Sequence, residues 1–180
     1  MTLSTLLESA ARLCASDHAW LLRRQGECFS WLASYGHATE IHTRIRDYFS
    51  TRAIPLDRGS IVGQTMLEAK TVQVSDVLAD PQYALIDLQN IAGYRAALGV
   101  PLLREGHVVG AIFLARAVPQ PFTDRQIELI ETFADQAVIA KMGCGSRRSK
   151  TQIDQNGYSA KFAVLHNAAQ TAMMRSVEPG

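Results

Sequence analysis

One segment near residue 110 is apolar on both of its faces, and it constrains the fold more than any other feature of the chain. Residues 108–115 read Val-Val-Gly-Ala-Ile-Phe-Leu-Ala. Successive side chains of an extended strand point to opposite sides, so the even-numbered residues 108–114 would face one way and the odd-numbered residues 109–115 the other. Because both sets are apolar, the pattern predicts a central strand that is covered on each side.

The rest of the chain supplies partners for such a strand. Apolar residues recur every three or four positions, which predicts helices, in residues 3–14, in residues 41–52 and after the capping box Thr123–Gln126. Ser60 is placed to cap a further short helix. Short β-leaning segments predict strands at residues 19–24, 27–34, 71–74 and 98–103. The expected fold class is therefore α+β, with one antiparallel sheet and helices on its faces.

The 19 residues from Ser75 to Gly93 have no clean period, which predicts short helices or a functional lid. Tyr83, Tyr94 and Arg95 bracket this stretch, and Asp76, Asp87 and Asn90 add polar groups to it. A ligand pocket needs apolar walls with a few polar groups, so these six residues are the predicted ligand-binding set. The alternative is that the two tyrosines pack the lid onto the sheet while Arg95 pairs with an aspartate at the surface.

Charge divides the chain into two parts. Residues 1–140 hold 12 Lys and Arg against 15 Asp and Glu, whereas residues 141–180 hold 6 against 2. This predicts one domain over residues 1–140 and a basic tail over residues 141–180. The tail is expected to be a solvated linker or a weak helix over residues 158–177; a tail left by a disrupted reading frame is the other alternative. The cluster Arg147-Arg148-Ser149-Lys150 lacks interleaved aromatic residues, so nucleic-acid binding is not expected.

Composition points to the cytoplasm. No apolar run approaches the ~20 residues of a membrane span, and the N-terminus lacks the basic region of a signal peptide. Cys14, Cys28 and Cys144 form no CxxC pair and leave an odd thiol, which favours a reducing compartment. We expect Cys14 and Cys28 to be packing residues.

Several motifs, in order along the chain, resemble those of GAF domains, the small-molecule-sensing relatives of PAS domains. The resemblance covers the body to about residue 140 and is closest to the GAF domains of bacterial sensor histidine kinases. The segments that carry it are Gly59-Ser-Ile-Val-Gly63, Thr71-Val-Gln-Val-Ser-Asp76, Asp80-Pro81 with Tyr83, Gly93-Tyr-Arg-Ala-Ala-Leu-Gly-Val-Pro-Leu-Leu103, Glu105-Gly-His-Val-Val-Gly-Ala-Ile-Phe-Leu114 and Phe122-Thr-Asp-Arg-Gln-Ile-Glu-Leu129. It implies a GAF/PAS-like antiparallel sheet flanked by helices.

The resemblance also implies a function. Such a domain is a cytoplasmic regulatory module that binds a small molecule between sheet and lid and forms a homodimer through its terminal helices. A histidine kinase or another output partner of a two-component system would receive its signal. The cofactor stays open, because this fold hosts cyclic nucleotides, bilins, haem, metabolites and nothing at all. No cysteine stands between Cys28 and Cys144 for a covalent bilin link, and the Asn-Lys…Phe…Asp-Glu pattern of cyclic-nucleotide-binding members is missing.

Motifs for catalysis and metal binding are weak. His37 and His42 are five residues apart, which on a helix separates their rings by ~140°, so we expect a solvated helix face and no metal site. Ser60 stands one place early for a nucleophile elbow and serves as an N-cap. The sequence therefore predicts a non-enzymatic sensor without catalytic residues. A ligand-free dimerisation scaffold or detached sensor-kinase fragment is the first alternative, and a thiol-based reductase is the second.

Overall fold

The computed structural model of the chain describes residues 2–139. Every helix and strand predicted within this range is present in the structure. The structure also contains a two-residue strand, β3, which is too short to show a hydrophobic period in the sequence. The elements in chain order are α1 (Leu3–Leu13), β1 (His18–Gln25), β2 (Cys28–Tyr35), α2 (Thr39–Thr51), β3 (Ile54–Pro55), α3 (Ile61–Glu68), β4 (Val72–Val74), η1 (Val77–Ala79), α4 (Ile86–Ala92), β5 (Ala96–Arg104), β6 (His107–Arg116) and α5 (Asp124–Ala137).

The six strands form one antiparallel sheet in the order β3-β2-β1-β6-β5-β4. Strand β6 lies between β1 and β5 and is buried from Gly110 to Arg116, which confirms the predicted central strand. The backbone of β1 passes so close to Gly110 that a Cβ there would collide with the Leu22 carbonyl oxygen. Glycine is therefore required at this point of the β1–β6 pairing.

The predicted alternation along β6 is wrong at its first two described apolar residues, Val108 and Val109. The register jumps from the pair Leu102–Gly110 to the pair Leu103–Val108, which leaves Val109 as an extra residue. Such a bulge moves the residues before it to the opposite face. Val108 consequently packs on the same side as Phe113, and Val109 packs on the side of Ile112.

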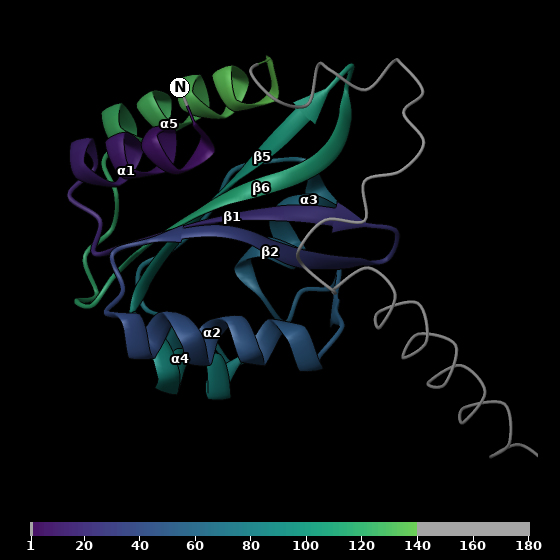
Figure 1. The fold of residues 1–180 in the computed structure, drawn as a ribbon. Coiled ribbons are helices and arrows are strands. Elements are labelled where there is room, and N and C mark those ends of the chain that lie inside the picture. Colours follow the sequence, from purple (N-terminus) through teal and green to yellow (C-terminus); the bar gives the residue numbers. More distant parts are fainter. Residues whose placement is uncertain (1, 140–180) are drawn as a thin grey trace, which may run out of the picture. The chain divides into compact units, whose positions relative to one another are not determined.

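Helices cover both faces of the sheet and produce two apolar cores. Figure 1 shows α1 and α5 side by side above the sheet, with α2 and α4 together below it. The first core joins α1 and α5 to Leu21, Leu98 and Ile112. The second joins α2, α3 and α4 to the other face of the strands, where Trp20 and Phe113 lie. The antiparallel α+β fold predicted from the sequence is confirmed.

Polar side chains define where the helices begin. Ser60 accepts a hydrogen bond from the Gly63 amide at 2.9 Å, as its position predicts. Thr123 and Gln126 form both hydrogen bonds of the predicted capping box at the start of α5. Each such cap satisfies amides that the helix itself leaves without acceptors.

The predicted lid contains two short helices, η1 and α4, joined by turns.

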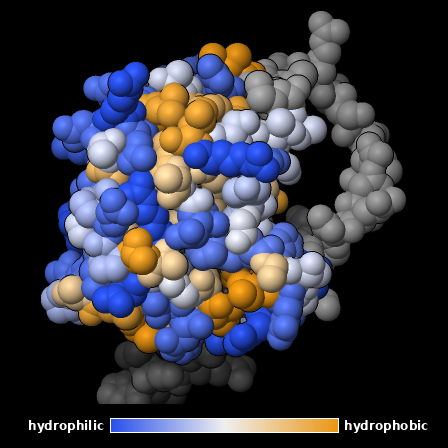
Figure 2. All heavy atoms as spheres, turned by 90° about the vertical axis from the view of Figure 1, so that its left-hand side faces the viewer, coloured by the Kyte–Doolittle hydropathy of each residue, from blue (hydrophilic) through white to orange (hydrophobic). Residues whose placement is uncertain are grey.

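On the side of the molecule drawn in Figure 2, hydrophobic residues form separate patches divided by polar ones. Within residues 2–139, no helix has both the length and the hydropathy needed to cross a membrane. The predictions made for the basic tail over residues 141–180 lie outside the described residues.

Candidate functional site

The space between the sheet and the lid is a small enclosed cavity. Its volume is about 10 Å³, roughly the room that one water molecule needs. Aromatic rings fill most of the space: Trp20 stacks on Phe113 with centroids 4.9 Å apart, and Tyr94 meets both rings edge-on. The lining residues are Trp20, Leu22, Phe29, Phe49, Ser60, Ile61, Val62, Tyr83, Leu85, Leu88, Tyr94 and Phe113.

Two of the predicted ligand-binding residues, Tyr83 and Tyr94, meet inside this cavity. Their hydroxyl groups hydrogen-bond to each other, and the side chain of Gln89 donates to the Tyr94 carbonyl oxygen at 2.8 Å. Tyr94 is 1% exposed and Tyr83 is 8% exposed. Burial is the main cause that raises the pKa of both phenols, so they stay neutral. The pair thus closes the lid onto the sheet through one polar contact in an apolar setting.

We expect the two tyrosines to be energetically coupled. Tyr83→Phe or Tyr94→Phe leaves the partner hydroxyl buried without its hydrogen bond, and each change should lower the free energy of unfolding by about 1–3 kcal/mol. The double variant removes both polar groups and should lose less than the sum of the single losses. Urea unfolding of the four proteins measures this coupling. Additive losses would show that the hydroxyls act independently.

A second polar contact at the cavity wall involves histidines that the sequence alone does not connect. The Trp20 indole N–H donates to His37 Nε2 at 2.7 Å, and the His37 ring stacks on His18 with centroids 4.1 Å apart. His37 precedes α2, while His42 lies on α2 and hydrogen-bonds to Ser34 at 2.9 Å. The expected solvated helix face is therefore wrong, because both rings pack against the strands.

Folding disfavours protonation of His37. Burial, followed by the nearby His18 and His42, lowers the pKa of His37 from 6.5 to about 3. Between these two values the unfolded chain holds a proton that the folded chain lacks, so stability is complete above pH 6.5 and falls as the pH drops toward 3. His37→Gln keeps an acceptor for the Trp20 indole. It should reduce the loss of unfolding free energy between about pH 7 and about pH 5 by up to about 1 kcal/mol, after solvent screening.

Urea unfolding of both proteins at the two pH values measures the difference. His107→Gln is the matched control, because His107 is exposed at the start of β6. Equal acid slopes for His37→Gln and the wild type would contradict the proposed role of this ring.

Two further residues of the predicted set pair with each other away from the cavity. Arg95 donates to Asp76 Oδ1 at 2.8 Å, and its second nitrogen contacts the other carboxylate oxygen. Asp76 also accepts from the Leu78 amide at 3.1 Å and so begins η1. The hydrogen bond from Arg95 is the main cause that lowers the pKa of Asp76, and the bond from the Leu78 amide lowers it further. These contacts match the alternative prediction made from the sequence, in which Arg95 pairs with an aspartate at the surface.

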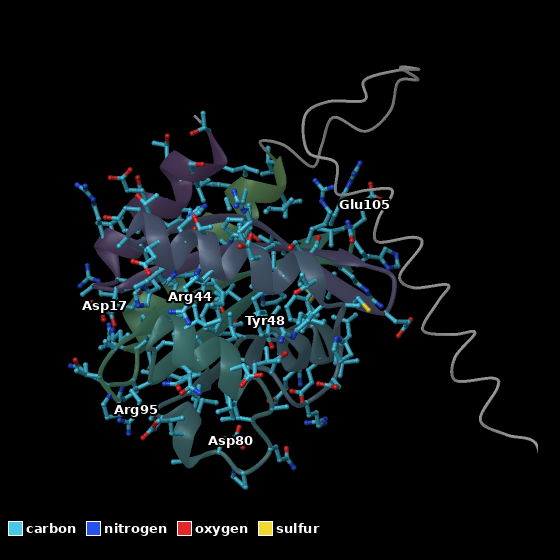
Figure 3. All side chains as sticks on the ribbon, turned by 60° about the horizontal axis from the view of Figure 1, so that its bottom comes forward. Asp17, Arg44, Tyr48, Asp80, Arg95 and Glu105 are labelled. Atoms are coloured by element: carbon cyan, nitrogen blue, oxygen red, sulfur yellow. The ribbon has the colours of Figure 1, made fainter. Side chains whose placement is uncertain are left out.

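The last two residues of the set, Asp87 and Asn90, face a different hollow. They line an open groove of about 520 Å³ between α4 and α2. The residues that line it from α2 are Arg44, Asp47, Tyr48 and Thr51, with Arg52 at the helix end and Ile91 completing the α4 side. In Figure 3, the labelled Arg44 and Tyr48 lie along α2, and Arg95 lies apart from them. The structure thus distributes the six predicted residues over three places.

A buried arginine that the sequence reading did not single out joins the two terminal helices. Arg116, at the end of β6, is 5% exposed. Its five N–H groups donate to the carbonyl oxygens of Cys14, Ala15, Gln120 and Pro121 and to Oε1 of Gln126, at 2.8–3.3 Å. The guanidinium therefore fastens the end of α1 to the beginning of α5. The sequence signal that could have indicated this role is a single arginine at the end of an otherwise apolar strand.

The cysteines within residues 2–139 are placed for packing. Cys14 is fully buried in the core between α1 and α5, and Cys28 is partly buried at the start of β2. Burial raises the pKa of both thiols, which disfavours the reactive thiolate. Cys144 lies outside the described residues.

An antiparallel sheet with α1 and α5 on one face and a lid over a cavity on the other defines an α+β domain built on one helix-covered sheet. The family comparison gives the particular family: the model of the GAF domain matches residues 2–140, and the chain belongs to this family. GAF domains are commonly signal-sensing domains, and some lie in sensor kinases.

Solved structures agree on the fold. A GAF domain/HD domain protein from Geobacter sulfurreducens is 16% identical with a TM-score of 0.64, over 75% of this chain and 86% of that one. A domain assigned to a two-component sensor histidine kinase of Sinorhizobium meliloti is 18% identical with a TM-score of 0.58, over 77% and 87%. A type II free methionine-R-sulfoxide reductase from Thermoplasma acidophilum is 16% identical with a TM-score of 0.54, over 73% and 89%. These identities support the shared fold alone.

Proposed function

We propose that the chain is a cytoplasmic signal-sensing domain that admits a small molecule between sheet and lid and signals through α1 and α5. The observation that carries the proposal is the Tyr83–Tyr94 hydroxyl pair, which places two polar groups inside an apolar, aromatic cavity. Apolar walls with a few placed polar groups are what a small-molecule site needs. A ligand with one polar group would replace one hydroxyl partner by hydrogen-bonding to the other.

Entry of a ligand requires the lid to move, because the closed cavity holds about 10 Å³. Besides the tyrosine pair, the lid is attached by the Asp76–Arg95 ion pair, by the Gln89 side chain and by backbone hydrogen bonds. The Ala84 amide donates to the Gly59 carbonyl oxygen at 2.7 Å, and the Val77 amide donates to the Arg95 carbonyl oxygen at 2.8 Å. Displacing this segment breaks local bonds only and leaves the central strands paired.

A short physical connection leads from the cavity to the terminal helices. Tyr94 in the cavity is followed by Arg95, whose amide donates to the Arg116 carbonyl oxygen at 2.8 Å. The side chain of Arg116 binds the end of α1 and the beginning of α5. A shift of the lid end would therefore reach the two helices through which a homodimer and a histidine kinase or other output partner would read the signal. The size of this coupling is limited by the ligand's preference for one lid arrangement.

Native mass spectrometry of the chain purified from cells tests the proposal directly. We expect a dimer that carries a small molecule, which is released on denaturation, and a changed Trp20 fluorescence after release. Trp31→Phe removes the other tryptophan and assigns the signal to Trp20. A monomer without a bound molecule, and with no thermal shift from any small-molecule library, would contradict the sensor.

A ligand-free dimerisation scaffold, alone or as a detached part of a sensor kinase, is the second candidate. The filled cavity favours it, because about 10 Å³ leaves no room for a ligand while the lid is closed. A ligand-free dimer in the same experiment would support this candidate. We do not propose a thiol-based reductase, since burial raises the pKa of the Cys14 and Cys28 thiols in the described part of the chain. Methionine-sulfoxide reduction that is lost on Cys→Ser substitution would overturn that view.

A further inference from the structure

We propose that the open groove between α2 and α4 binds a small zwitterion of amino-acid type, at a site separate from the enclosed cavity. The groove measures about 520 Å³, which is ample for such a molecule. Its walls come from one face of each helix, because the lining positions recur at spacings of three and four residues. The proposal goes beyond the proposed function, since it concerns the outer side of the lid.

The charges that line the groove are balanced. Arg44 and Arg52 contribute two cations, and Asp47 and Asp87 contribute two carboxylates. Within residues 2–139, Asp47 pairs with Arg46 at 3.4 Å, and no carboxylate lies within 4.0 Å of the guanidinium of Arg44 or Arg52. A simple anion would meet the carboxylates, and a simple cation would meet the arginines. A molecule that carries both charges is complementary to both sets.

The floor of the groove is already arranged for such a ligand. The Arg52 guanidinium lies over the Tyr48 ring, 4.3 Å from its centroid, which restricts where this cation can point. Tyr48 is 7% exposed, and burial is the main cause that raises the pKa of its phenol. The charge of Arg52, at the end of α2, lowers this pKa, and the charge of Asp87, on α4, raises it. The opposite charges of α2 and α4 therefore act on the same small region.

Each part of the ligand has a matching group. The planar fork of Arg44 or Arg52 suits a carboxylate, to which it donates two hydrogen bonds. An ammonium group would donate to Asp87 and to the Asn90 amide oxygen. The side chain of the ligand would lie against Ile91 and the Tyr48 ring.

Binding here would hold the lid in place. Helix α4 presents Asp87, Asn90 and Ile91 to the groove, and it presents Leu88 to the enclosed cavity. A ligand that bridges α2 and α4 would stabilise the closed arrangement of α4, because it binds that arrangement only. Hydrogen exchange of the α4 amides should slow down in its presence.

The test uses the full chain and the twenty L-amino acids, each at millimolar concentration, in calorimetric or NMR titrations. We expect at least one to bind, and its N-acetyl form and its methyl ester, each lacking one charge, to bind about tenfold more weakly or worse. Arg52→Ala and Asp87→Asn should each cause a similar loss. Arg125→Ala and Asp135→Asn are matched controls, since both residues are exposed on α5.

The proposal would be overturned if no amino acid binds, if the single-charge forms bind equally well, or if binding survives both groove substitutions. Circular dichroism of the variants checks that the exposed substitutions leave the fold intact. Tyr83→Phe separates the two sites, because it alters the enclosed cavity and leaves the groove lining unchanged. A ligand lost in Tyr83→Phe but retained in Arg52→Ala belongs to the cavity, which supports the sensor proposal and counts against the groove.

Discussion

Replacing Arg116 with methionine is expected to lower the free energy of unfolding by about 3–5 kcal/mol, since several carbonyl oxygens lose a charged donor at once. The guanidinium carbon of Arg116 also lies over the Phe122 ring, 4.1 Å from its centroid, and methionine loses this cation–π contact while keeping a similar apolar stem. The loss would come mainly from the hydrogen bonds to Cys14, Pro121 and Gln126, and the lost contact with the Phe122 ring would add to it.

Urea unfolding measures this effect, and Arg125→Met is its matched control. Arg125 lies in the first turn of α5 and is exposed, so its replacement should change stability by less than about 0.5 kcal/mol. Arg116→Lys should fall between methionine and the wild type, because an ammonium group cannot reach all five acceptors. Equal stabilities of Arg116→Met and Arg125→Met would show that the carbonyl contacts contribute nothing net.

Trp20→Ala should cost about 3–5 kcal/mol, because it removes a large buried ring and leaves a cavity. Trp20 is 2% exposed and contacts Phe49, Tyr94 and Phe113. Its loss also leaves His37 without the indole donor. The variant should consequently gain an apolar cavity beside the lid.

Indole offers a direct check of that cavity. Added to Trp20→Ala, it should raise the thermal midpoint by filling the space, and it should leave the wild type unchanged because the native cavity is full. Trp31→Ala is the control, since Trp31 is only partly buried and packs at the margin of the same core. Stabilisation of the wild type by indole would show instead that the lid opens readily.

The fold could be predicted from the sequence because its periodic segments are unambiguous. The doubly apolar strand β6 and the capping box of α5 each depend on residues that are close together in the sequence, so both can be predicted from the sequence alone. The bulge at Val109 could not be predicted, because a register shift arises from pairing with a partner strand. The two-residue strand β3 has no period to detect.

The candidate site was harder to predict, because it depends on contacts between distant residues. The sequence places Tyr83 and Tyr94 in one predicted ligand-binding set of six residues, and the fold brings these two together in one cavity. The sequence predicts Asp76 and Arg95 for the same set, yet these two side chains bind each other away from the cavity. The contact between Trp20 and His37 links residues 17 positions apart and follows from the β1–β2 geometry rather than from any motif.

The two layers of the domain differ in how they should respond to acid. On the side of α1 and α5, Arg116 binds carbonyl oxygens, which keep their hydrogen-bonding capacity at any physiological pH. On the lid side, the Trp20 indole depends on a neutral His37 ring. Acidification should therefore loosen the lid layer first, while the layer that would face a second copy of the chain stays closed.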